Sequence, residues 1–173
     1  MRIEQKDAPF VQWLWDLFDS IRIVGLPPKA RDRTDHKRNF SWTTTYFATF
    51  SLPFFTVLFY QWYRQVDGKN VKVLPPNIGE LFTPVVFAFL ICGDASYHKR
   101  DGCIHIYTNS FTPAEVDLLR SILLTNLNIE STRNVANRAK EQYMIRIPKG
   151  EVGKLQELVK PHIPSIMHYR VGL

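Results

Sequence analysis

The chain has 173 residues, of which 22 are lysine or arginine, 16 are aspartate or glutamate and 45% are hydrophobic. This composition excludes a disordered or fibrous chain, and the length predicts one domain or two small halves packed together. The formal net charge of +6 favours a polyanionic partner such as nucleic acid, although an ordinary solvated basic surface accounts for it equally well. Cys92 and Cys103 lie in apolar stretches, which predicts reduced thiols rather than a disulfide.

The N-terminal residues predict a short strand, an amphipathic helix and a basic connection. The strand is at Arg2–Gln5, and apolar residues recur at helical spacing from Phe10 to Ile21. Residues 27–39 contain two prolines and almost no apolar side chain, so we interpret them as a basic loop or hairpin tip. We assign nucleic-acid contacts to its cations, which are Lys29, Arg31, Arg33, Lys37 and Arg38.

The uncharged stretch from Ser41 to Tyr63 is long enough for a membrane-spanning helix, but its chemistry predicts another structure. Its first part is rich in threonine and aromatic residues, which favour a strand. Pro53 ends that strand and opens a separate helix. We therefore predict strand, turn and helix, and no membrane partner. Asp67 and Gly68 then mark a turn, and segment 66–83 is interpreted as a linker.

The second part of the chain opens with a helix that is apolar on every side. Thr83 predicts its N-cap and Pro84 its first helical position. The apolar run 85–92 ends at Gly93 and Asp94. A helix without a polar face is expected to be buried on all sides.

The rest of the second part alternates between strands and helices. A strand at 103–108 precedes a helix that Thr112 caps, with Glu115 in its first turn. A strand at 143–148 and a helix at 152–162 close the chain. Between them we predict a second basic loop, whose cations are Arg133, Arg138 and Lys140.

Both parts follow the order strand, helix, basic loop, strand and helix, which suggests an internal repeat. A shift of 101 positions places Ile3 on Ile104 and Leu17 on Leu118. The same shift carries the apolar helix that leads the second part to a position before Met1. We therefore expect the first repeat to lack its leading helix.

Residues 87–95, Phe-Ala-Phe-Leu-Ile-Cys-Gly-Asp-Ala, resemble a degenerate copy of the LAGLIDADG motif of homing endonucleases and intron maturases. The bulky Phe89 stands where close helix packing prefers a small residue, and Ala95 replaces the final glycine. Other segments also resemble landmarks of this family, namely 2–5, 72–78, 81–84, 108–112, 159–162 and 165–169.

The resemblance implies an α+β fold made of two pseudo-symmetric αββαββα halves. In this family the two motif helices pack together at the centre, and the two sheets form a basic saddle over a DNA duplex. The implied division is a truncated first half at 1–65, a linker at 66–83 and a second half at 84–173 that carries the degenerate motif 87–95.

The resemblance also implies Mg²⁺-dependent cleavage, with the metal held between two carboxylates, one from each motif helix. Asp94 is the candidate metal ligand, but the predicted truncation removes its partner, so we expect Asp94 to be vestigial and no cofactor to be required. Lys72 matches a basic residue near the family's active site, and Asn109 matches a polar residue of the metal shell or a phosphate contact. Their alternatives are a linker lysine and a strand-end turn residue.

Two functions follow from this resemblance. The first is a catalytically silent protein that binds structured RNA, such as intron RNA or organellar ribosomal RNA, in a mitochondrion or another organelle. A larger ribonucleoprotein assembly would cover its exposed motif helix. The alternative is an active Mg²⁺-dependent endonuclease of duplex DNA, completed by a fusion partner or a dimer. Further candidate phosphate contacts, beside the loop cations, are His98, Lys99 and Arg100, and Arg146 is a further candidate for nucleic-acid binding.

Overall fold

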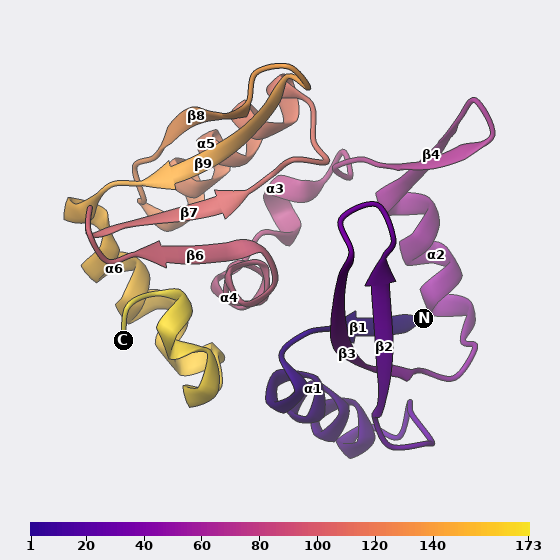
Figure 1. Cartoon of the computed structure of the whole chain (residues 1–173). Coiled ribbons are helices and arrows are strands. Elements are labelled where there is room, and N and C mark those ends of the chain that lie inside the picture. Colours follow the sequence, from indigo (N-terminus) through magenta and orange to yellow (C-terminus); the bar gives the residue numbers. More distant parts are fainter. The chain divides into compact units, whose positions relative to one another are not determined.

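The computed structural model describes residues 1–173 and divides the chain into two compact units, Met1–Leu58 and Phe59–Leu173 (Figure 1). In each unit, helices pack on one face of an antiparallel sheet. The predicted α+β fold class is confirmed. None of the helices is both long enough and apolar enough to span a membrane.

Unit 1 is a three-stranded sheet with one helix packed on it. Its elements are β1 (Arg2–Gln5), α1 (Ala8–Ser20), β2 (Lys29–Asp35), β3 (Phe40–Ala48) and the first part of α2 (Pro53–Trp62). The strand order is β1-β3-β2. Asp7 caps α1 by accepting a hydrogen bond from the Phe10 backbone N–H at 3.1 Å. Phe18 of α1 meets Phe47 of β3 edge to face, so the core of this unit lies between α1 and the sheet.

The stretch interpreted as a basic loop or hairpin tip is largely a strand, and its end is the tip of a hairpin. Residues 29–35 form β2, which pairs along its length with β3, while 27–28 and the turn at 36–39 lie outside the strand. Charged residues have low strand propensity, but pairing with the threonine-rich β3 overrides it, because strand propensity depends on context. The prediction of strand, turn and helix over 41–63 is confirmed by β3 and α2.

The segment interpreted as a linker contains regular structure. A hairpin of β4 (Tyr63–Val66) and β5 (Lys69–Lys72) turns at Asp67 and Gly68, which both have positive φ, at 49° and 72°. This conformation matches the right-handed twist of a two-residue hairpin and favours an Asp-Gly pair. The short helix α3 (Ile78–Leu81) follows. Side chains of α5 hold the segment, since Glu115 accepts from the Leu74 N–H at 2.8 Å.

Unit 2 is built on a four-stranded sheet with the order β6-β7-β9-β8. Its further elements are α4 (Pro84–Asp94), β6 (Ala95–His98), β7 (Cys103–Tyr107), α5 (Pro113–Leu127), β8 (Thr132–Asn137), β9 (Gln142–Ile147), α6 (Lys149–Val159) and the 3₁₀ turns η1 (Lys160–His162) and η2 (Ser165–Arg170). Thr112 caps α5 as predicted, and Glu115 completes a capping box, because the two residues satisfy each other's backbone N–H groups. The predicted second basic loop is largely the strand β8, and β6 is an additional strand.

The core of unit 2 lies between the sheet and the helices α4, α5 and α6 (Figure 1). Isoleucines at alternate positions of β7 and β9 face the helices and are fully buried. They are Ile104, Ile106, Ile145 and Ile147.

The motif helix α4 is buried on one side only, which corrects the expectation of burial all round. Phe87, Ala88 and Ile91 are inaccessible to solvent, whereas Val85 is 44% exposed and Val86 36%. The buried side packs against α6, η1 and the sheet. Composition alone predicted a helix with neighbours on all sides, but the neighbours within unit 2 cover only one.

The two sheets repeat one another, as the sequence predicts. Ile3 of β1 pairs with Phe47 of β3, and Ile104 of β7 pairs with Ile147 of β9. The strands β1, β3 and β2 thus correspond to β7, β9 and β8. Unit 1 contains no counterpart of α4, and none of β6 either, so the outer edge of β1 is unpaired.

Candidate nucleic-acid interface

The sheet of unit 2 has one face covered by helices and one open, polar face. Strand register fixes which residues share the open face, because directly paired residues point to the same side. One row crosses all four strands, in the order Ser96, His105, Arg146 and Thr132. A second row joins Tyr107, Met144 and Asn134.

Two histidines stand next to each other on this open face. The ring centroids of His98 and His105 are 3.9 Å apart. Ser96 Oγ lies 3.2 Å from His98 Nε2 and 3.3 Å from the Tyr107 hydroxyl. Burial, and then the charges of His98 and Arg146, lower the pKa of His105. A polar network therefore occupies the middle of the sheet face.

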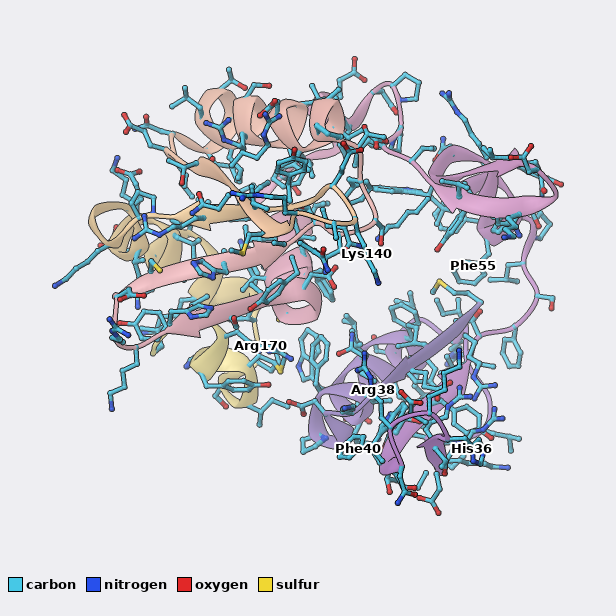
Figure 2. The ribbon with its side chains drawn as sticks, turned by 45° about the horizontal axis from the view of Figure 1, so that its top comes forward. His36, Arg38, Phe40, Phe55, Lys140 and Arg170 are labelled. Carbon is cyan, nitrogen blue, oxygen red and sulfur yellow. The ribbon has the colours of Figure 1, made fainter.

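Cations of unit 2 also gather in the two turns that border this sheet. Lys99 and Arg100 are exposed in the β6–β7 turn. Arg138 and Lys140 are exposed in the β8–β9 turn, where Figure 2 labels Lys140. Turn cations beside an open sheet face are suited to phosphate contacts, while the face itself offers polar side chains for base edges and cations that can also reach phosphates.

Arg133 is separated from these cations, although it belongs to the same predicted basic loop as Arg138 and Lys140. It pairs with Ile145, a core position, and so points to the helix-covered face. There it forms an ion pair with Asp117, donates to the Pro113 carbonyl at 3.3 Å and lies 4.9 Å from the Tyr143 ring centroid. Its partners belong to α5 and β9 of the same unit, so Arg133 joins β8 to α5.

The sheet of unit 1 has a corresponding open face that carries the cations of β2. Lys29, Arg31 and Arg33 are two residues apart on β2, so all three point to the same side. They share this side with Tyr46 and Trp42 of β3. Lys37 and Arg38 lie in the β2–β3 turn, which Asp35 closes by accepting from both of their backbone N–H groups. Figure 2 labels Arg38 and Phe40 at this end of the unit.

One acidic side chain organises the cations of this face. Arg33 donates to both carboxylate oxygens of Glu4, at 2.8 and 2.7 Å, and Arg2 lies 2.9 Å from the same carboxylate. Hydrogen bonds from Thr44 and then Arg33 lower the pKa of Glu4 to about 2. Arg33 is thereby fixed, whereas Arg38 is 85% exposed and has only a 3.8 Å ion pair with Asp35.

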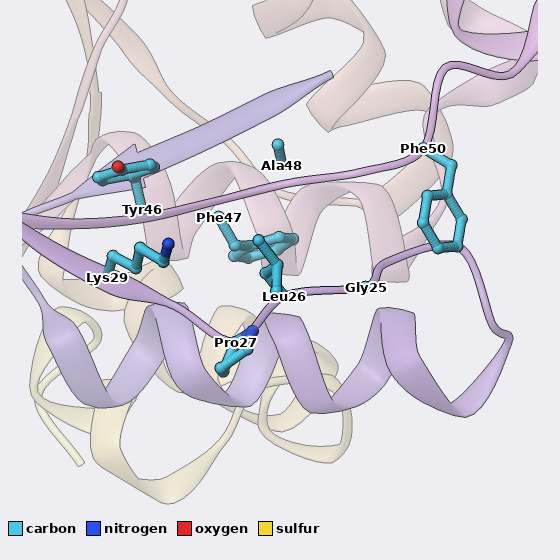
Figure 3. A pocket seen from close by; sticks show the side chains of 8 residues that line it. All are labelled: Gly25, Leu26, Pro27, Lys29, Tyr46, Phe47, Ala48 and Phe50. Atoms are coloured by element: carbon cyan, nitrogen blue, oxygen red, sulfur yellow. The ribbon is translucent and has the colours of Figure 1, made fainter.

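A pocket of about 400 Å³ lies beside this face in unit 1 (Figure 3). Its lining is apolar except for Lys29 and the Tyr46 hydroxyl, and the other lining residues are Gly25, Leu26, Pro27, Phe47, Ala48 and Phe50. It therefore offers no set of acid, base and nucleophile.

The three candidate catalytic residues are not brought into contact with one another. Asp94 is exposed at the end of α4. Lys72 ends β5 with its Nζ 5.1 Å from the Phe111 ring centroid. Asn109 is exposed after β7, and its backbone carbonyl accepts from Gln142 Nε2 at 3.3 Å.

A divalent metal does not fit the donors of this chain alone. Asp94 supplies one carboxylate, and no group of three or more His, Cys, Asp or Glu side chains in residues 1–173 is arranged to hold a metal ion. Unit 1 offers no counterpart of Asp94, because it contains no counterpart of α4.

Comparison with known proteins identifies the family. The model of the LAGLIDADG DNA endonuclease family matches residues 1–155, and the chain belongs to this family. It is 30% identical over 128 residues to the cytochrome b mRNA maturase bI2 of Saccharomyces cerevisiae, a match that covers 73% of this chain and 30% of the maturase. It is 29% identical over 126 residues to the DNA endonuclease I-ChuI of Chlamydomonas applanata, covering 70% of this chain and 57% of that protein. The chain thus spans only part of these relatives.

Solved structures confirm the fold. The homing endonuclease I-WcaI, bound to its DNA recognition sequence, matches with a TM-score of 0.83 and 22% identity over 98% of this chain and 74% of that chain. A mesophilic variant of the homing endonuclease I-DmoI matches with a TM-score of 0.54 and 12% identity, over 92% of this chain and 79% of that chain. The predicted LAGLIDADG-type architecture is therefore confirmed.

Proposed function

We propose that this chain binds duplex nucleic acid on the open faces of its two sheets, and that residues 1–173 alone do not cut it. One observation carries the proposal: each sheet has one apolar face packed under helices and one polar face bordered by turns rich in cations. Polar side chains on such a face suit base edges in a groove, and cations on the face or in its turns suit phosphates.

Duplex DNA is the better supported ligand. The I-WcaI structure is that of a protein bound to its DNA recognition sequence, and one I-DmoI structure is a complex with target DNA in the presence of Mg²⁺. The same architecture supports the same class of ligand here. The single carboxylate of Asp94 supports binding without cleavage, because the family's reaction implies two carboxylates.

Structured RNA is the second candidate. The yeast relative is named an mRNA maturase. In unit 1, Phe40 and Trp42 stack at 5.7 Å beside Lys6, whose Nζ is 5.1 Å from the Trp42 ring centroid. Exposed aromatic and cationic groups of this kind suit unpaired bases. An intron RNA fits this candidate, and the names of the relatives support an organellar origin. A place in an organellar ribosome remains a prediction.

The test uses the purified chain with labelled duplexes selected from a random-sequence pool and, in parallel, with a folded intron RNA. We expect binding that weakens steeply as salt rises, and no cutting when Mg²⁺ is added. Mg²⁺-dependent cutting that disappears in Asp94→Asn would instead show an active endonuclease. Binding that does not change with salt would contradict the proposal altogether. Tighter binding of the intron RNA than of any selected duplex would favour the RNA candidate.

A further inference from the structure

We propose that His98, His105 and Arg146 form a phosphate-binding site on the open face of the unit 2 sheet, and that this site takes up a proton when it binds a phosphodiester. The proposal rests on the proposed function, because it places one backbone phosphate of the bound nucleic acid at a defined position. The site lies on three adjacent strands, since β7 stands between β6 and β9.

The three side chains converge because of strand register. His105 pairs directly with Arg146 across β7 and β9. His98 pairs with Cys103, which is two residues from His105 on the same face, and the two histidine rings meet at 3.9 Å. Paired residues have Cβ atoms about 5 Å apart, so three nitrogen-bearing groups can reach one phosphate.

The site has more positive than negative charge. Arg146 is half-buried and forms no salt bridge. The neighbouring charged groups are Lys99, Arg100 and Asp101 of the β6–β7 turn, and Asp101 lies 3.8 Å from Arg100. The other titratable groups facing the pair are Cys103, whose Sγ is 3.6 Å from His105 Nε2, and Tyr107. An incoming anion would supply the missing negative charge.

This arrangement links proton uptake to binding. In the free protein, burial and the charges of His98 and Arg146 lower the pKa of His105, while Asp101 opposes them. A phosphate placed between the rings and Arg146 favours the charged imidazole and raises that pKa in the complex. At any pH between the pKa of His105 in the free protein and its pKa in the complex, the complex then holds more protons than the free protein. Affinity must rise as pH falls through this window.

The experiment measures the affinity of the chain for a fluorescein-labelled mixed-sequence DNA duplex from pH 5.5 to 8 at constant ionic strength. We expect the affinity to rise toward low pH, by at most about tenfold per pH unit for one proton. His105→Gln should flatten this dependence, because glutamine donates a hydrogen bond but does not titrate. His98→Gln should reduce the pH dependence, because it removes one of the charges that lower the pKa of His105 in the free protein.

His162→Gln is the matched control, because it changes a histidine of η1, which packs on α4 and α6 outside the open face. It should keep the pH dependence of the unchanged chain. Thermal melts of all three variants verify folding.

The outcomes separate this proposal from the proposed function. If the duplex fails to bind at every pH and salt concentration, the proposed function is wrong. If it binds and His105→Gln titrates like the unchanged chain, the phosphate site is wrong while the binding surface stands. A shift of the His105 imidazole resonances on adding inorganic phosphate, absent in Arg146→Ala, would support the site independently of DNA.

Discussion

Glu4 shows how single side chains prepare a binding face. Its carboxylate lies among Arg2, Arg33 and Thr44, so it fixes one arginine of β2 and partly neutralises the sheet surface. Cations that remain outside this cluster, such as Arg38, keep their charge for a ligand. Some cations of the open face are thus paired within the protein, and others are available to a ligand. The net charge of the chain does not distinguish the two kinds.

The Glu4 cluster predicts a pH dependence of stability. Because the pKa of Glu4 is lowered to about 2 in the folded state, the carboxylate stabilises folding above its unfolded pKa of about 4.3. That contribution is lost as pH falls from about 4.3 toward 2. Glu4→Gln should therefore lower the free energy of unfolding at pH 7, and the difference from the unchanged chain should shrink in acid.

Urea unfolding at pH 7, 4 and 3 measures this difference. Asp16→Asn is the control, since Asp16 is an exposed residue of α1 that accepts one hydrogen bond from Gln12. A Glu4→Gln deficit that is equal at pH 7 and pH 3 would contradict the assignment.

At the scale of elements, register decides the role of residues that the sequence groups together. Arg133 begins the second basic stretch and Arg146 follows it, yet β8 and β9 turn them to opposite faces of one sheet. The alternation of Lys29, Arg31 and Arg33 was visible in the sequence as a two-residue period. The strand β2 was nevertheless not predicted, because charged runs with prolines are typical of loops.

The motif helix α4 gives a second prediction at this scale. Phe87→Ala removes a ring that is completely buried and should cost about 3–5 kcal/mol of unfolding free energy. Val85→Ala changes the exposed side of the same helix and should cost no more than about 0.5 kcal/mol in the isolated chain. Denaturant titration of both variants compares the two sides directly. Equal losses would contradict the one-sided burial of α4.

The helix α2 is apolar in composition but is not buried. None of its residues is buried, and Tyr60 is 74% exposed. Its counterpart α6 packs against α4. Unit 1 contains no such motif helix, so α2 has no equivalent neighbour within that unit.

For the whole molecule, the sequence was sufficient for the family, the fold class and the order of the repeat. Short-range patterns made two kinds of feature predictable, namely the N-caps at Thr83 and Thr112 and the apolar core strands. The additional strands β6 and β8 and the β4–β5 hairpin were not predicted. These segments are short and largely polar, so their sequences show no clear strand pattern. They become strands by pairing with a neighbouring strand. The His98–His105 pair likewise depends on register between two strands.

The central claim is that the open sheet faces bind nucleic acid. The most direct measurement compares Arg146→Ala and Arg133→Ala, two variants of equal net charge, by the salt dependence of duplex binding. Arg146→Ala is expected to weaken binding and to reduce the slope of log affinity against log salt by about 1. Arg133→Ala, on the helix-covered face, is expected to keep the slope of the unchanged chain at temperatures where it remains folded. Equal effects of the two variants on affinity and slope would contradict the account.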